Sequence, residues 1–151
     1  MFWMIIIWIH ILAAMFWIGG MLFFVLVLVP ILRDLSVGQK MDLMSRVGKR
    51  FRKAGWVSLA ILLLTGFLNL YHRGIPPSEY GSALWIKLSL FVVMVSLTLL
   101  HDFALGPRSI QSGRSGAGRN SLLSVTRWVA RFNLVIGLFI ILAAVYMARG
   151  Y

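Results

Sequence analysis

The stretch FWMIIIWIHILAAMFWIGGMLFFVLVLVPIL, at residues 2–32, decides the fold class, because His10 is its one ionisable side chain. A helix of about 20 apolar residues crosses a bilayer. This stretch is longer, so as a membrane span it must tilt or protrude. It lacks the basic leading region of a signal peptide, and its apolar run is too long for one. We therefore interpret it as a retained transmembrane helix.

Three further apolar stretches follow, at about residues 54–71, 83–105 and 125–147. The chain is 60% hydrophobic with a mean hydropathy of +0.89, whereas about half of the residues in soluble domains are apolar. The sequence predicts an all-α, polytopic membrane protein, with residues 1–151 forming one domain, a four-transmembrane-helix bundle.

The segments between the spans carry the remaining structural signals. Residues 34–53 are polar and basic and are compatible with a short interfacial helix. Residues 72–81 contain a double proline that indicates a turn. Residues 106–120 are rich in Gly, Ser and Arg, which is typical of a flexible loop. Pro30 is expected to bend the end of the first span.

The net charge of +11 indicates contact with lipid head groups rather than nucleic acid, because the basic residues are confined to loops and helix ends. Positively charged loops stay in the cytoplasm. The chain should therefore be a multi-pass protein of the cell (inner) membrane with both termini outside. The basic residues on the predicted cytoplasmic side are Arg33, Lys40, Arg46, Lys49, Arg50, Arg52, Lys53, Arg108, Arg114, Arg119, Arg127 and Arg131, against Arg73 and Arg149 on the other.

Several kinds of chemistry are excluded by what the sequence lacks. There is no cysteine, which removes disulfides, thiolate nucleophiles, Cys-ligated zinc and iron–sulfur clusters. Only four acidic residues occur, with no paired carboxylates in the spans, and there is no phosphate-binding glycine loop. Any redox role would therefore have to rest on a cofactor.

Helical spacing places polar residues on one face of each span, and such faces should point into the bundle. Ser, Thr and Asn on these faces can also simply bond across helices. The four faces are Ser58, Thr65, Asn69 and His72; Lys87, Met94, Thr98 and His101; His10, Ala14, Trp17 and Met21; and Asn133, Gly137, Ile140 and Ala144.

The rise of a helix divides these residues into two levels. His10, His72 and Lys87 each lie about 30 Å above the basic end of their span, near the outer face. His101 lies about two turns from the inner end, beside Asp102 and at the depth of Asn133.

Two imidazoles that face each other across a bundle can ligate haem iron. We take His10, His72 and His101 as candidate axial or metal ligands, and Lys87 as a candidate partner of the propionates. Trp17 and Asn133 complete the candidate cofactor-binding set. Each of these residues also has an alternative without a cofactor. His10 can bond within the bundle, and His72 can be an ordinary interfacial histidine. His101 can pair with Asp102 at the helix end, and Lys87 can extend to the interface.

Three short motifs resemble a known family. Residues 10–20, HILAAMFWIGG, are similar to the first span of CopD-type (copper resistance D) membrane proteins and of the related HemJ-type protoporphyrinogen oxidases. Tyr80-Gly81 with residues 85–88 (WIKL) resembles the start of their third span, and residues 131–133 (RFN) the start of the last. The HemJ pattern differs in having a histidine at the position of Trp85 and a glutamate at that of Leu134.

The CopD resemblance implies copper handling, and the HemJ resemblance implies a b-type haem with the positions of His10 and Lys87 important. We predict a membrane haem b protein in electron transfer or haem-linked redox chemistry, with copper binding or transport and protoporphyrinogen oxidation as alternatives. The redox partner is not identifiable from the sequence. Small residues around Gly19 predict a homodimer.

Overall fold

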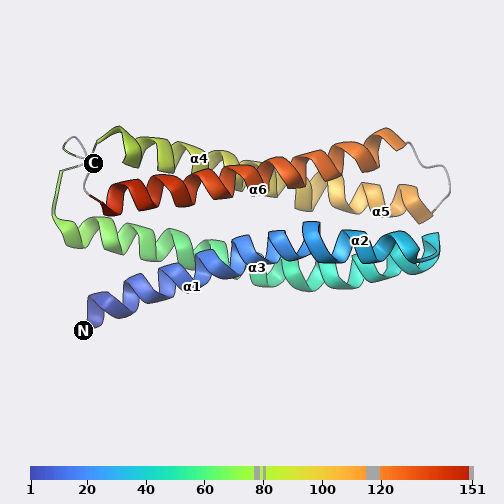
Figure 1. Cartoon of the computed structure of the whole chain (residues 1–151), viewed down its shortest axis with the longest axis horizontal. Helices are drawn as coiled ribbons and strands as arrows, with labels where there is room; N and C mark the ends of the chain where they lie inside the picture. Colours follow the sequence, from blue (N-terminus) through green and yellow to red (C-terminus); the bar gives the residue numbers. More distant parts are fainter. Residues whose placement is uncertain (77–78, 80, 115–119, 150–151) are drawn as a thin grey trace.

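The computed structural model describes residues 1–76, 79, 81–114 and 120–149, and within these ranges the regular structure is helical throughout (Figure 1). Four helical segments are long and apolar enough to cross a membrane: Phe2–Asp34, Val37–Arg73, Ser82–Ser112 and Ser124–Ala148. The predicted all-α fold with four spanning helices is confirmed. The elements are α1 (Phe2–Phe23), the π-helical turn η1 (Phe24–Leu28), α2 (Val29–Ile31), the 3₁₀ turn η2 (Leu32–Asp34), α3 (Val37–Arg73), α4 (Ser82–Leu99), the π-helical turn η4 (Leu100–Leu105), α5 (Gly106–Arg114) and α6 (Asn120–Ala148).

The helices form two antiparallel pairs that lie side by side (Figure 1). One pair is α1 with α3, and the other is α4 with α6; α6 also contacts α1, and α5 contacts α3. The start of α1 and the end of α6 lie at the same end of the bundle, called here the terminal end. The opposite end, where η2, the start of α3 and α5 lie, is called the basic end.

Residues 37–53 of the basic segment are part of α3 and form no separate interfacial helix. Ser36 caps α3: its hydroxyl accepts a bond from the Gln39 backbone N–H at 3.4 Å, and its own N–H donates to the Gln39 side chain at 3.2 Å. This reciprocal arrangement satisfies two N–H groups that the helix leaves free. No proline follows before residue 76. Once nucleated, the helix therefore propagates into the second span as a single rod of 37 residues that ends at Gly74, in the left-handed conformation with φ 61°.

The expected loop at residues 106–120 is helical in its first part, as α5. Pro107 follows the π-helical turn η4 directly, and the N–H of Gly106 bonds to the carbonyl of His101 with the wider spacing of a π-helix. Proline lacks the N–H that would continue the normal pattern, so α5 continues the helix of the third span after a π-helical turn. The Ser109 hydroxyl donates to the Gly106 carbonyl at 3.0 Å within this turn. Residues 115–119 of the expected loop, and Pro77, Ser78 and Tyr80 of the earlier turn, lie outside the described residues.

The first span changes its winding just before Pro30. The N–H of Val29 bonds to the carbonyl of Phe24, which is the wider spacing of a π-helix. Proline lacks the N–H that would continue the normal pattern and its ring crowds the preceding turn. The expected disturbance at Pro30 is thus a π-helical turn.

Close contact between α1 and α3 positions the core. Trp17 is 5% exposed and packs against Gly55, where a Cβ would lie 2.5 Å from the indole ring. The hydroxyl of Ser58 donates to the backbone carbonyl of Ala13 at 2.7 Å. Around Trp17 the buried core consists of Ile18, Leu59, Met94, Leu134 and Ile136. All four spanning helices contribute to this core.

We predict that Gly55→Ala destabilises the protein by about 1–3 kcal/mol, because the added methyl group overpacks the contact with Trp17. Gly48→Ala is the matched control on the same helix, since nothing lies within 4 Å of a Cβ there. Thermal unfolding of the detergent-purified variants, followed by circular dichroism, measures the difference. Equal midpoints for the two variants would contradict the packing.

Candidate functional site

His10 and Thr65 join α1 and α3 on the terminal side of the core. The Nδ1 atom of His10 lies 2.7 Å from the Thr65 hydroxyl oxygen. That hydroxyl oxygen lies 2.6 Å from the carbonyl oxygen of Ile61, one turn earlier in α3. Thr65 is buried with 4% of its surface exposed, so water does not compete for this contact.

The geometry of Thr65 fixes the tautomer of the neutral His10 ring. Two oxygens 2.6 Å apart need a proton between them, and the hydroxyl has one proton to give. The hydroxyl therefore donates to Ile61 and accepts from His10, whose Nδ1 carries the hydrogen. In the neutral ring, Nε2 then holds a free lone pair. Gly66 flanks the same edge of the ring, since a Cβ there would lie 3.5 Å from Cε1 of His10.

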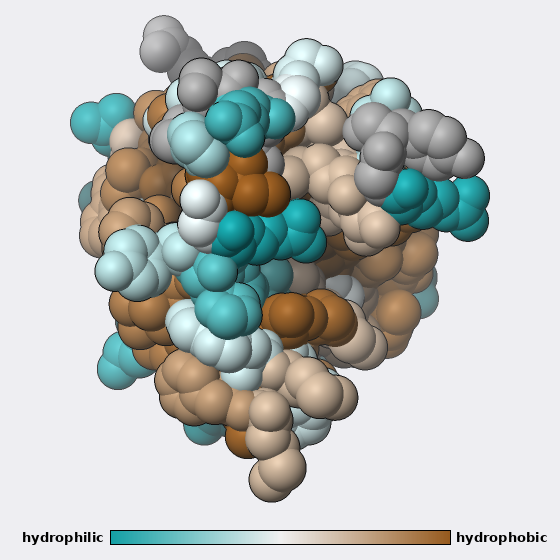
Figure 2. Space-filling model, turned by 90° about the vertical axis from the view of Figure 1, so that its left-hand side faces the viewer, coloured by the Kyte–Doolittle hydropathy of each residue, from teal (hydrophilic) through white to brown (hydrophobic). Residues whose placement is uncertain are grey.

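Lys87 belongs to the other helix pair, and its charge acts on His10. Its ammonium group, on the first turns of α4, is near enough to interact electrostatically with the His10 imidazole and with the guanidinium of Arg73. Figure 2, which views the terminal end, shows hydrophilic residues crossing the middle of this face between hydrophobic ones. We call His10, Thr65, Lys87 and Arg73 the terminal-end site.

His72 lies apart from His10. Its ring stacks on Trp3, with centroids 3.7 Å apart and an interplanar angle of 10°, and its side chain is exposed. Trp3 precedes His10 by seven residues and His72 follows Thr65 by seven, so the two contacts are about 10 Å apart along the helices. Lys87 lies at the same end of the bundle as His10, within range of its charge, and His72 lies two turns further out.

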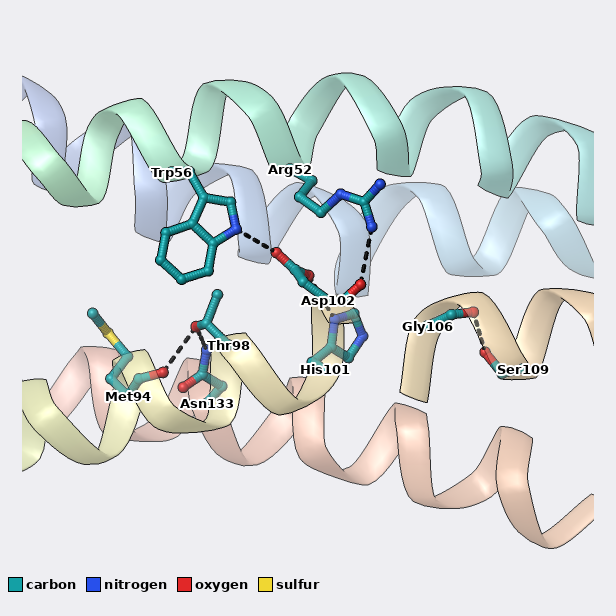
Figure 3. Close-up of polar contacts among 9 residues, drawn as sticks. All are labelled: Arg52, Trp56, Met94, Thr98, His101, Asp102, Gly106, Ser109 and Asn133. Carbon is teal, nitrogen blue, oxygen red and sulfur yellow. Dashed lines mark hydrogen bonds and ion pairs between the residues drawn. The ribbon is translucent and has the colours of Figure 1, made fainter. Parts of the chain in front are cut away.

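A second polar cluster lies towards the basic end, where α3 meets η4 (Figure 3). The Asp102 carboxylate accepts from Trp56 Nε1 at 3.1 Å and from His101 Nδ1 at 3.0 Å. The guanidinium of Arg52 donates to the Asp102 backbone carbonyl at 2.9 Å. We call these four residues the basic-end network. His101 and Asp102 lie in the π-helical turn η4, a distortion that is frequent at functional positions.

Asn133 and Trp17 are buried between the two clusters. The Asn133 amide donates to Thr98 at 2.9 Å, and Thr98 donates to the Met94 carbonyl at 2.8 Å (Figure 3). Among the described residues, the Asn133 Oδ1 and Trp17 Nε1 atoms have no hydrogen-bond partner. An unpaired buried donor and acceptor are costly, so each is a position where a water molecule or a ligand would be stabilised.

The sequence-based set of candidates is therefore divided among three places. His10 and Lys87 share the terminal-end site, His101 belongs to the basic-end network, and Trp17 and Asn133 lie in the core. The set omitted Arg52 and Trp56, although their spacing of four places both on one face of α3. Their proximity to Asp102 depends on the packing of α3 against η4, which no local pattern reports.

Among the described residues, no three His, Asp or Glu groups come together closely enough to hold an ion. His10 and His101 are each a single imidazole whose Nδ1 is held by an oxygen acceptor, which leaves Nε2 for a ligand. Metal-binding histidines are oriented in this way by their second nitrogen.

Comparison with known proteins identifies relatives of this chain. A family model described as "Copper resistance protein D" (CopD) matches residues 45–147. A protein of Aquifex aeolicus named only as uncharacterized is 33% identical over 145 residues, covering 94% of this chain and 92% of the relative. The copper resistance protein D of Pseudomonas syringae pv. tomato is 30% identical over 139 residues, covering 85% of this chain.

The chain spans 44% of the length of the Pseudomonas protein. No solved structure matches the chain significantly. The match to the family model begins within α3 and ends near the end of α6, so it includes Thr65, Lys87 and the basic-end network and leaves out α1 with His10.

We predict that Thr65→Val abolishes the Nδ1–H preference of the neutral His10 ring, because valine keeps the shape and removes the acceptor. Nitrogen-15 NMR of histidine-labelled protein in bilayers distinguishes the tautomers, with His10→Gln used for assignment. Thr65→Ser retains the hydroxyl and should retain the wild-type spectrum. A wild-type ring protonated at Nε2 would contradict the hydrogen-bond assignment.

Proposed function

Because this chain belongs to the CopD family of copper resistance proteins, we propose that it handles copper within the membrane and that His10 receives the ion. The observation that carries the proposal is the hydrogen bond from His10 Nδ1 to Thr65. It holds the imidazole in one orientation and leaves the Nε2 lone pair unused. Imidazole is a good ligand for copper ions.

The candidate for a second donor to the ion lies on α6. Thioether sulfur selects Cu(I), and Met147 continues the inward face of α6, fourteen residues after Asn133. Gly137 of α6 packs against Ile18 of α1. From that contact, Met147 is ten residues and His10 eight residues towards the terminal end, so their levels differ by about 3 Å. Met147 is half-buried, and we propose it as the partner of His10.

Haem b is the second candidate ligand, and the charges of the terminal-end site favour it. A porphyrin supplies four nitrogens, so a single histidine is enough to complete its attachment. Lys87 and Arg73 are the basic side chains of the terminal-end site, and basic side chains pair with carboxylates such as the propionates. In this case the protein would be a haem protein in electron transfer or, less directly, a protoporphyrinogen oxidase of the HemJ kind.

The copper proposal predicts that His10→Ala weakens Cu(I) binding by more than about tenfold, since loss of a supporting partner alone costs 10–100-fold. Met147→Leu should also weaken binding, whereas His72→Ala, which changes an exposed ring stacked on Trp3, should not. Competition with a Cu(I) chelator measures these affinities on the detergent-purified protein.

The absorption spectrum of the same preparations separates the two candidates. A Soret band in wild-type protein made with ample haem, lost in His10→Ala, would replace copper by haem as the ligand. Equal Cu(I) affinity for wild type and His10→Ala would contradict the copper site.

We also propose that both termini lie outside the cytoplasm and that the basic end faces it, because the Lys and Arg residues are concentrated there. Alkaline phosphatase fused after Ile75 should be active, since that position would be outside. The same enzyme fused after Ser36 should be inactive. The reverse pattern would overturn the orientation.

A further inference from the structure

An open groove of about 770 Å³ runs between α1 and α3 in the half of the bundle nearer the basic end. One wall is the face of α1 formed within residues 15–24, and the other is the face of α3 within residues 43–54. Its size is that of a small-molecule binding pocket. It lies away from His10 and from the basic-end network, whose residues do not line it.

Aromatic rings and two glycines shape the groove. The ring of Phe51 fills the space beside Gly20, where a Cβ would collide with it, and it packs against Phe16 and Phe24 with centroids 6.0 and 5.0 Å away. Gly19 has nothing within 4 Å of its Cβ position. The groove is therefore open above Gly19 and has an apolar, aromatic wall.

Two arginines line the groove on α3. Arg46 forms an exposed ion pair with Asp42 at 2.9 Å, and Arg50 has no acidic partner among the described residues. The two arginines are four residues apart on α3, on the basic-end side of Phe51, the ring that packs beside Gly20. An apolar channel with guanidinium groups at its basic-end side matches an acyl chain that ends in a phosphate.

We propose that this groove binds one anionic phospholipid of the surrounding bilayer, with an acyl chain between α1 and α3 and the phosphate at Arg46 and Arg50. The head group would then lie at the basic end, and the chain would run along the span towards the core. Basic residues at the membrane surface attract anionic lipids by about 1 kcal/mol each.

Charge complementarity favours a lipid over a second copy of this chain. The protein has four acidic residues. Asp42 is paired with Arg46, Asp102 is held by the basic-end network, and Glu79 lies at the terminal end. The fourth, Asp34, lies in η2 at the basic end, among an excess of Lys and Arg residues. A second copy would thus bring many positive charges and almost no carboxylates to the two arginines, whereas an anionic lipid supplies the missing negative charge.

Lipid binding here has a structural consequence for the bundle. Phe51 contacts the groove on one side and Trp17 on the other, with ring centroids 6.1 Å apart. Trp17 in turn packs on Gly55. A ligand held between α1 and α3 would therefore stabilise the register of the two helices, as any ligand specific to the folded state does.

The test uses the full chain in nanodiscs that contain phosphatidylethanolamine with phosphatidylglycerol, released into native mass spectrometry. Wild type should retain one phosphatidylglycerol in preference to phosphatidylethanolamine. Removing one arginine should weaken retention about fivefold, and the double variant Arg46→Ala/Arg50→Ala about thirtyfold. Phosphatidylglycerol should also raise the thermal midpoint of wild type and not that of the double variant.

Two controls separate the groove from general attraction to a negative surface. Lys49→Ala/Lys53→Ala removes the same charge from exposed positions of α3 that do not line the groove, and it should retain the lipid. Gly19→Leu fills the groove without a charge change and should lose the lipid, while Gly48→Leu should not.

Three results would overturn the proposal. One is equal loss of lipid in the lysine and arginine double variants, which would indicate surface attraction alone. Another is a lipid-free wild-type dimer that Gly19→Leu converts to a monomer, which would assign the groove to a second copy. The third is retention of the lipid in Gly19→Leu with its fold intact.

Discussion

Trp17 of α1 packs against the backbone of α3 at Gly55, where a side chain of any other kind would collide with the indole. This contact sets how far α1 is displaced along α3. With that displacement fixed, Ser58 reaches the Ala13 carbonyl, Thr65 reaches His10, and His72 reaches Trp3. In lipid, where apolar side chains gain little from leaving their surroundings, such close packing and internal hydrogen bonds hold helices together. The polar contacts between α1 and α3 therefore depend on the glycine at position 55.

The two histidines that face inward are supported in the same way at opposite ends of the bundle. His10 donates from Nδ1 to a threonine whose own proton is committed to the helix backbone, and His101 donates to a carboxylate that Trp56 also holds. Each arrangement orients an imidazole and leaves Nε2 for another partner. Between the two ends, Trp17 and Asn133 contribute a buried donor and a buried acceptor with no partner among the described residues. Polar groups are thus placed along the interior from one end of the bundle to the other.

The exterior of the bundle is apolar along the spans and strongly basic at one end, and the two properties meet in the groove between α1 and α3. Arg46 and Arg50 line it together with the aromatic rings. The four carboxylates of the chain are too few to neutralise its 15 basic residues. The neutralising charge has to come from the surroundings, and in a membrane the phosphates of lipids are the abundant source. The proposed copper site and the proposed lipid groove thus depend on different parts of the same α1–α3 contact.

The sequence by itself determined the helical class and the four spans, because long apolar runs can satisfy their backbone groups in lipid as helices. It also placed His10, Lys87, Asn133 and Trp17 on inward faces, since helical periodicity is a local property. The continuity of α3 was not predicted, because the polar, basic residues before the second span suggested a separate interfacial helix. In the structure the Ser36 cap starts a helix that continues through them into the span. Tertiary structure alone decided that His10 pairs with Thr65, about 10 Å from His72, and that Arg52 and Trp56 meet Asp102. These contacts depend on how one helix is displaced and rotated against another. For α1 and α3 the fit of Trp17 to Gly55 sets that displacement, and the sequence pattern of neither helix alone reports it.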